Sequence, residues 1–185
     1  MKRVNKYYSC AVLGQAPLSF PWGFDEEAEE CRDMKLALAQ QIMVLRQSGV
    51  TSFYVACDPG IGLYAAEIIN ILREKDKDLQ LFCVAPHEEQ ATKWTPQLRE
   101  RYFAMLGGCT RIKMVALHST PNAQLTAYKE IIEAADIVLA VCNPDRHGGN
   151  SADKAIAYAM LRKCPLVSIH PDTLVVHMCN MSCEK

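Results

Sequence analysis

The chain has 185 residues, half of them hydrophobic, which is enough for one well-packed core and gives no sign of a second domain. Its 20 basic and 21 acidic side chains leave a formal charge of −1, which excludes a broad electrostatic field for DNA, RNA or an anionic membrane. We predict a single Rossmann-like domain over residues 1–185, with a core at about 7–176 and a flexible tail at 177–185.

In chain order, short apolar runs have the character of β-strands. Most of them are continuous rather than alternating, so both faces of the sheet should be covered. Helical patterns lie between most of them, and this rhythm predicts an α/β fold of the three-layer, Rossmann-like, doubly wound kind. The mainly parallel sheet of about six strands would consist of YYSCAVLG (7–14), TSFYVAC (51–57), LQLFCVAP (79–86), RIKMVAL (111–117), DIVLAVCN (136–143) and PLVSIH (165–170).

The helices have recognisable starts and stops. The first should end near Ser48-Gly49, and the second should begin at Asp58-Pro59. Thr95-Pro96 and Thr120-Pro121 each indicate an N-cap with proline in the first turn. The core-facing stripes are Met34, Leu38, Ile42 and Leu45 in the first helix, Ile68, Ile69 and Leu72 in the second, and Ala152, Ala155, Ile156, Ala159 and Met160 in the last.

The chain contains no apolar stretch long enough for a signal peptide, and none approaches the ~20 residues that span a bilayer. We therefore expect a cytoplasmic protein without a membrane partner. Most of the nine cysteines stand singly in apolar runs, which favours a reducing compartment over a disulfide framework. Cys57 and Cys142 could face one cleft as nucleophiles, although buried structural cysteine is the alternative.

Two glycine turns follow the second and fifth predicted strands, where open α/β sheets bind ligands. In the first turn, residues 58–62, the Asp58 carboxylate would cap the following helix and repel phosphate. It could instead recognise a ribose hydroxyl or an amine. In the second turn, CNPDRHGGNS, paired glycines and Arg146 could bind phosphate, and Asn150 or Ser151 would cap a helix. Both turns could also be purely structural.

Aromatic residues and soft metal ligands add further candidates. Phe20, Trp22 and Phe24 follow the first strand, where they could stack on a base, cover the sheet edge or join a subunit interface; Trp94 leaves the same question open. The tail segment HMCNMSC could bind copper(I) or zinc, or it could be a floppy or dimer-packing tail.

Four motifs occur in a specific order: FPWGFDEE (20–27), YAAE (64–67), KW (93–94) and AADIVLAV (134–141) before Gly-Gly. On these motifs the chain resembles the SLOG superfamily from about Cys10 to Pro171. These are Rossmann-like proteins related to DprA and to the LOG nucleotide-processing proteins, and the YpsA-like branch is the most similar. The resemblance implies a pocket for a nucleotide or nucleotide-derived ligand.

The chain departs from the branch at several positions. Its first turn reads LGQAP (13–17) where a Thr-Gly-His-Arg-Pro type is usual, so an imidazole and a guanidinium are missing. Gly62 stands where the branch has an acidic residue, and Asp58 could compensate from four residues earlier. Asn150 replaces a threonine after the paired glycines, and Tyr128 takes the place of an asparagine.

We expect a bound nucleotide-like small molecule rather than any certain cofactor or metal, and a homodimer remains open. Asp58 would recognise a hydroxyl, Arg146 a phosphate and Trp22 a base. Two alternatives are a hydrolase of LOG type that uses Asp58, Glu67 or His147, and a divergent protein that has lost ligand binding. The complete predicted site is Gly14, Gln15, Trp22, Asp58, Gly60, Gly62, Arg146, Gly148, Gly149 and Asn150.

Overall fold

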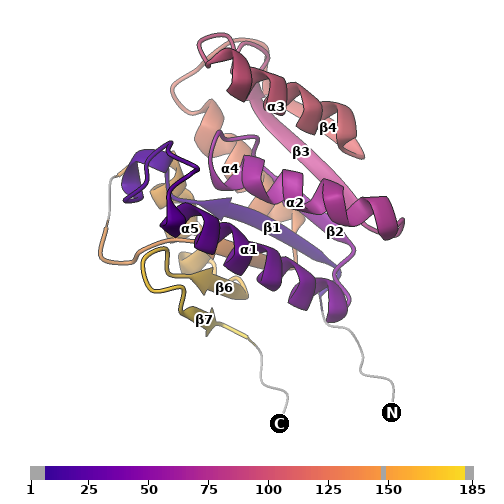
Figure 1. The fold of residues 1–185 in the computed structure, drawn as a ribbon, viewed down its shortest axis with the longest axis vertical. Coiled ribbons are helices and arrows are strands. Elements are labelled where there is room, and N and C mark those ends of the chain that lie inside the picture. Colours follow the sequence, from indigo (N-terminus) through magenta and orange to yellow (C-terminus); the bar gives the residue numbers. More distant parts are fainter. Residues whose placement is uncertain (1–6, 147–148, 182–185) are drawn as a thin grey trace.

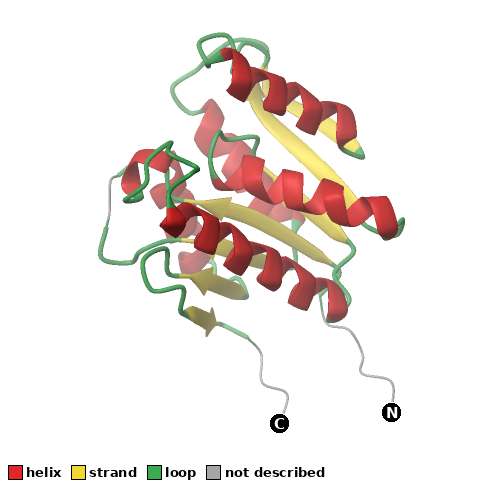
Figure 2. Ribbon diagram, viewed as in Figure 1, coloured by secondary structure: helices red, strands yellow, loops and turns green. Residues whose placement is uncertain are grey.

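The computed structural model describes residues 7–146 and 149–181, and it places a β-sheet between two layers of helices (Figures 1 and 2). The predicted three-layer α/β fold is therefore confirmed. The sheet has seven strands among the described residues. They are β1 (Ser9–Gly14), β2 (Ser52–Val55), β3 (Gln80–His87), β4 (Arg111–Ala116), β5 (Ile137–Val141), β6 (Leu166–Ile169) and β7 (Val176–Cys179).

The strand order is β4-β3-β2-β1-β5-β6-β7, and every neighbouring pair is parallel except β6 and β7. The chain first adds strands outward from β1 to β4 and then returns to the other side of β1 for β5. This reversal makes the carboxyl ends of β1 and β5 the topological switch point of the sheet. We call this region the β1–β5 crevice, because doubly wound folds bind ligands there. Gly14 and Val141 are register partners at that end.

The helices divide between the two faces of the sheet (Figure 1). α1 (Glu29–Gln47), α2 (Ile61–Lys75) and α3 (Pro96–Gly108) cover one face, and α4 (Ala123–Ala134) and α5 (Ser151–Leu161) cover the other. Alternation along β1 supplies both cores, because Cys10 and Val12 join the first while Ala11 and Leu13 join the second. Continuous burial of this kind explains why the central strands carry no polar alternation.

Some predicted helix details are confirmed and others are wrong. Thr95 caps α3, its Oγ1 accepting a hydrogen bond from the Leu98 amide at 3.4 Å, and Pro96 is the first helical residue. α4 begins only at Ala123 after Asn122, so Thr120-Pro121 is not its cap. Met160 is 45% exposed and leaves the apolar stripe of α5, since the stripe needs only its alanines and Ile156.

The segment expected as a flexible tail forms an additional edge strand. β7 pairs antiparallel with β6, with Ser168 opposite His177 and Leu166 opposite Cys179. His177, Met178 and Cys179 are exposed, so the segment lacks the apolar run from which the other strands were recognised. Among the described residues, no helix combines the length and the hydropathy that crossing a bilayer requires.

Candidate functional site

The loops after β1 and β5 meet at the carboxyl ends of their strands, and the Gln15 side chain joins them. Gln15 is 2% exposed. Its Oε1 accepts a hydrogen bond from the Asn143 amide at 2.8 Å, and its Nε2 donates to Asp153 Oδ1 at 3.0 Å and to the Arg146 carbonyl at 2.5 Å. Both ends of this amide are occupied by protein groups. Gln15 therefore connects the loop after β1 to the loop after β5 and to the following helix.

The glycines predicted to approach a ligand lie against the protein itself. A Cβ atom at Gly14 would stand 2.2 Å from Cγ1 of Ile61, the first residue of α2. A Cβ atom at Gly60 would stand 3.0 Å from Cγ of Pro17. Both glycines therefore permit the loops after β1 and β2 to pack directly on each other.

The expectation that the second helix begins at Asp58-Pro59 with Asp58 as its N-cap is wrong, because α2 begins at Ile61 and Gly60 is its N-cap residue. Asp58 instead lies two residues before that cap and binds the start of the helix from within the core. It is 5% exposed, and its Oδ1 accepts hydrogen bonds from the amides of Gly60 at 3.0 Å and Gly62 at 3.2 Å. Its Oδ2 has no hydrogen-bond partner of regular geometry among the described residues. Burial raises the pKa of this carboxyl group above the usual aspartate value, and the Gly62 and Gly60 amides and the nearby Tyr128 hydroxyl only partly offset that rise.

The loop after β5 forms the more open side of the crevice. Arg146 keeps 46% of its side chain exposed; its Nη2 lies 3.3 Å from Asp172 Oδ2, and its Nη1 donates to the Ser19 carbonyl at 3.3 Å. Gly149 is exposed with a φ of +67°, and Asn150 caps α5 by accepting a hydrogen bond from the Asp153 amide at 3.0 Å. Gly148 and His147 lie outside the described residues.

Trp22 lies in the core rather than at an open surface. It is 6% exposed and stacks on Phe20 with ring centroids 4.7 Å apart, while its Nε1 has no hydrogen-bond partner among the described residues. Phe24, two residues later, is 55% exposed. In this conformation the Trp22 ring is a packing element for the loop after β1.

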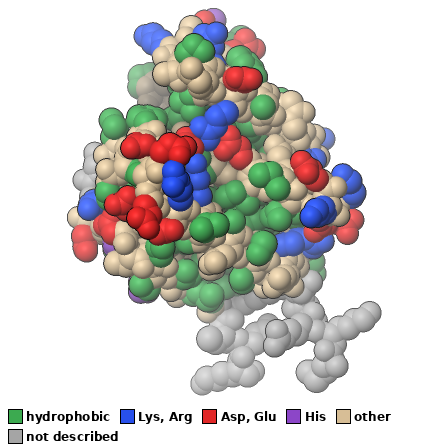
Figure 3. Space-filling model, viewed as in Figure 1, with side chains coloured by type: hydrophobic (Ala, Val, Ile, Leu, Met, Phe, Trp, Pro, Cys, Tyr) green, Lys and Arg blue, Asp and Glu red, His purple; other side chains and the backbone are tan. Residues whose placement is uncertain are grey.

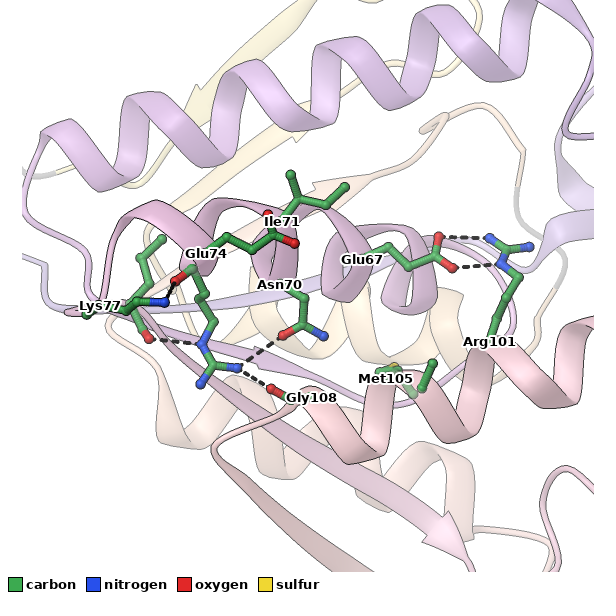
Figure 4. Close-up of a pocket in the computed structure, with 11 residues that line it drawn as sticks. Glu67, Asn70, Ile71, Glu74, Lys77, Arg101, Met105 and Gly108 are labelled. Carbon is green, nitrogen blue, oxygen red and sulfur yellow. Dashed lines mark hydrogen bonds and ion pairs between the residues drawn. The ribbon is translucent and has the colours of Figure 1, made fainter.

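A hollow of about 730 Å³ lies between α2 and α3, on the helical layer rather than at the strand ends (Figure 4). Two of its arginines are engaged by other groups of the protein. Arg101 donates two hydrogen bonds to the Glu67 carboxylate at 2.7 and 2.8 Å, and Arg73 binds Asn70 and the Leu79 and Gly108 carbonyls. These interactions connect α2 to α3, and Glu67 is one of the residues that make the connection.

Two further hollows share Lys93 and Trp94. One of about 600 Å³ lies beyond the ends of β3 and β4, and one of about 450 Å³ lies between the loop after β1 and the start of α3. His87 and Gln90 line the larger one. Neither residue was singled out from the sequence, although His87 is the last residue of the parallel strand β3 and Gln90 follows three residues later; this position at the carboxyl end of a strand is a signal that could have identified them.

A family model described as the YspA SLOG family matches residues 10–174. The chain belongs to this family. A UPF0398 protein of Halalkalibacterium halodurans is 28% identical over 120 residues, or 64% of each chain. A UPF0398 protein of Bacillus licheniformis is 28% identical over 90% of this chain and 92% of the relative. One from Bacillus cereus is 26% identical over 75% and 76%.

Three positions of this SLOG-family chain form one cluster. Oδ2 of Asp58 lies 2.4 Å from the place where a Cβ atom at residue 62 would stand, and Tyr128, 4% exposed on α4, lies next to the same carboxyl group. The resemblance implies an acidic side chain at 62 and an asparagine at 128. In this member, an aspartate from position 58 occupies the space where the side chain of residue 62 would begin.

The two cysteines that were expected to face one cleft lie in the core of this family member. Cys57 and Cys142 are buried, and burial raises the pKa of Cys142 to about 11. In β7 the strand alternation puts His177 and Cys179 on one face and Met178 on the other. Among the described residues, no three His, Cys, Asp or Glu side chains are placed to hold a metal ion.

Proposed function

We propose that this protein is a cytoplasmic binding protein that takes up a nucleotide or nucleotide-derived small ligand at the carboxyl ends of β1 and β5. One observation carries the proposal: the strand order reverses between these two strands, and the loops that follow them meet there. Phosphate groups bind at such a crevice in related architectures because helix N-termini and turn amides point toward it.

The chemistry of the β5 loop supports recognition of an anion. The Arg146 guanidinium is half exposed, and an incoming phosphate could compete with Asp172 and the Ser19 carbonyl for it. Gly149 adds exposed backbone in a left-handed conformation next to the start of α5. Guanidinium, backbone amides and a helix N-terminus together form a common phosphate-binding combination.

Binding without turnover agrees better with the candidate acids. The Asp58 carboxylate is buried and engaged in capping, and the Glu67 carboxylate is held by Arg101. A general acid or base must reach the substrate within hydrogen-bond distance. Cytoplasmic placement agrees with the eight described cysteines, all of which are free thiols.

A protein that has lost ligand binding is the second candidate, because Gln15 and Asp58 already satisfy groups that a ligand would otherwise bind. Thermal-shift measurements with ADP-ribose, NAD, AMP and cyclic nucleotides separate the two. A ligand at 100 times its Kd should stabilise the protein by roughly 2.7 kcal/mol. No shift with any of them would leave the second candidate standing.

The site is then tested with Arg146→Gln. Removal of one charge-assisted hydrogen bond, worth about 1.5–3 kcal/mol, should weaken binding by roughly ten-fold or more. Arg162→Gln is the matched control, because Arg162 is a similarly exposed arginine that bonds to Tyr158 at the far end of α5. Equal affinities for both variants would show that Arg146 does not contact the ligand. Light scattering of the free and loaded protein tests whether the protein is a homodimer, which the sequence leaves open.

A further inference from the structure

The hollow beside Trp94 lies at the ligand-binding end of the sheet but apart from the β1–β5 crevice. His87 ends β3, residues 88–95 continue from it, and Ser119 follows β4; the hollow of about 600 Å³ lies among them. The Gln90 Nε2 donates to the Cys57 carbonyl at 2.8 Å and so attaches this wall to the loop after β2. That loop separates the hollow from the crevice.

Two of the residues that line this hollow each carry a buried polar atom that has no hydrogen-bond partner among the described residues: Nδ1 of His87 and Oε1 of Gln90. The bond from Nε2 to the Cys57 carbonyl fixes which end of the Gln90 amide is the oxygen. Oε1 therefore requires a donor, and Nδ1 of His87, when it carries the proton, requires an acceptor. Unpaired buried polar groups are costly, so their presence on two side chains that line one hollow is a reason to look for a ligand that pairs with them there.

Trp94 supplies a stacking surface and Lys93 a charge. The Trp94 ring packs edge-to-face on the buried Tyr102, with centroids 5.2 Å apart and planes at 76°, so its orientation is fixed from behind. Trp94 is half-buried and lines both hollows. Lys93 also lines both, is exposed, and forms no ion pair with any described residue.

We propose that this hollow binds an amino-substituted heteroaromatic ring such as that of an adenine or cytosine nucleoside. The exocyclic amine donates to Gln90 Oε1, the neighbouring ring nitrogen accepts from His87 Nδ1, and the ring lies against Trp94. An anionic group on the ligand, such as a phosphate, extends toward Lys93. This site stands independently of the crevice at Arg146, because it shares no residue with it.

The edge chemistry is tested by calorimetric titration of the full-length protein with four nucleosides and one nucleotide. Adenosine and cytidine should bind, and inosine and uridine should bind at least about ten-fold more weakly, since a carbonyl replaces their amine and would face Gln90 Oε1. AMP should bind more tightly than adenosine, and Lys93→Gln should remove that difference. Equal affinities for adenosine and inosine, or no binding of adenosine, would overturn the proposal.

Two variants locate the site. Trp94→Ala should weaken adenosine binding about ten-fold or more, whereas Phe103→Ala should leave it unchanged, because Phe103 also packs on Tyr102 yet lines neither hollow. His87→Phe should weaken adenosine binding by a similar factor while the melting temperature of the free protein stays the same or rises, because an unpaired buried nitrogen is removed. A merely structural histidine would instead lower the melting temperature and leave the Kd unchanged.

The outcome is separable from that of the β1–β5 site. Arg146→Gln should leave the adenosine Kd unchanged if the ring binds beside Trp94. A loss of adenosine binding in Arg146→Gln, with none in Trp94→Ala, would move the ligand to the crevice and refute this proposal while supporting the other.

Discussion

Replacement of Gly62 by alanine distinguishes two opposite expectations. Gly62 is the second residue of α2. On helix propensity alone, alanine should stabilise the protein by up to ~1 kcal/mol. The alanine Cβ would, however, stand 2.4 Å from Oδ2 of Asp58, whereas non-bonded atoms need about 3.5 Å. The carboxylate would therefore have to move by about 1 Å.

That movement is not free, because Oδ1 of the same carboxylate binds the Gly60 and Gly62 amides at 3.0 and 3.2 Å. Hydrogen bonds to charged groups contribute about 1.5–3 kcal/mol each. Losing one of them and gaining the helix propensity leaves a net destabilisation of about 0.5–2 kcal/mol for Gly62→Ala. For a domain of this size the melting temperature should fall by about 1–8 °C.

Urea unfolding followed by circular dichroism measures the effect, with a double-mutant cycle as the decisive step. With Asp58→Ala in the background, Gly62→Ala should become neutral or stabilising, which gives a coupling of about 2 kcal/mol. Gly107→Ala is the matched control, since a Cβ atom at this helical glycine in α3 meets nothing within 4 Å. Stabilisation by Gly62→Ala in the natural background, or strict additivity in the cycle, would refute the steric argument.

Three further changes test the neighbouring interactions. Gln15→Ala removes the hydrogen bonds of this buried side chain to the Asn143 amide and to Asp153 Oδ1, so unfolding in urea should show a loss of about 2–4 kcal/mol. Burial raises the folded-state pKa of Asp58 above its unfolded value. The resulting contribution to folding stability is fully present below the ordinary aspartate pKa and is lost as pH rises through the folded-state pKa. Asp58→Asn should therefore flatten the curve of unfolding free energy against pH in that window. The pKa of Glu26 shifts in the opposite direction. Burial raises it, but the hydrogen bonds and charges of Arg101 and Lys35 outweigh burial and lower it overall, so the contribution of Glu26 to folding stability is lost as pH falls. Arg101→Met should therefore move the acid-unfolding midpoint to higher pH, as followed by circular dichroism, and an unchanged midpoint would argue against the Glu26 pairing.

The fold was predictable because the central strands are buried on both faces and therefore appear in the sequence as continuous apolar runs. β7 was missed because an edge strand needs no such run: His177, Met178 and Cys179 face solvent, and only pairing with β6 makes the segment a strand. The sequence placed the helix start at Asp58-Pro59, two to three residues too early, because Gly60 is the N-cap of α2; the Asp58 carboxylate nevertheless accepts hydrogen bonds from the Gly60 and Gly62 amides.

The candidate site was harder to predict, because a sequence does not show what approaches a glycine. Gly14 and Gly60 were expected near a ligand, and in the folded chain Ile61 and Pro17 approach them. The same limit applies to Trp22, because the sequence does not show that its ring stacks on Phe20. Which groups contact these residues depends on how segments distant in the sequence pack together, and local sequence patterns do not determine that packing.

The position of Gln15 has a consequence for motion at the switch point. One planar amide binds the backbone after β5 and the first turn of α5 at once, so these segments cannot separate from β1 one bond at a time. Opening is therefore cooperative, and the Asn143 N–H should exchange with solvent only when the whole corner releases.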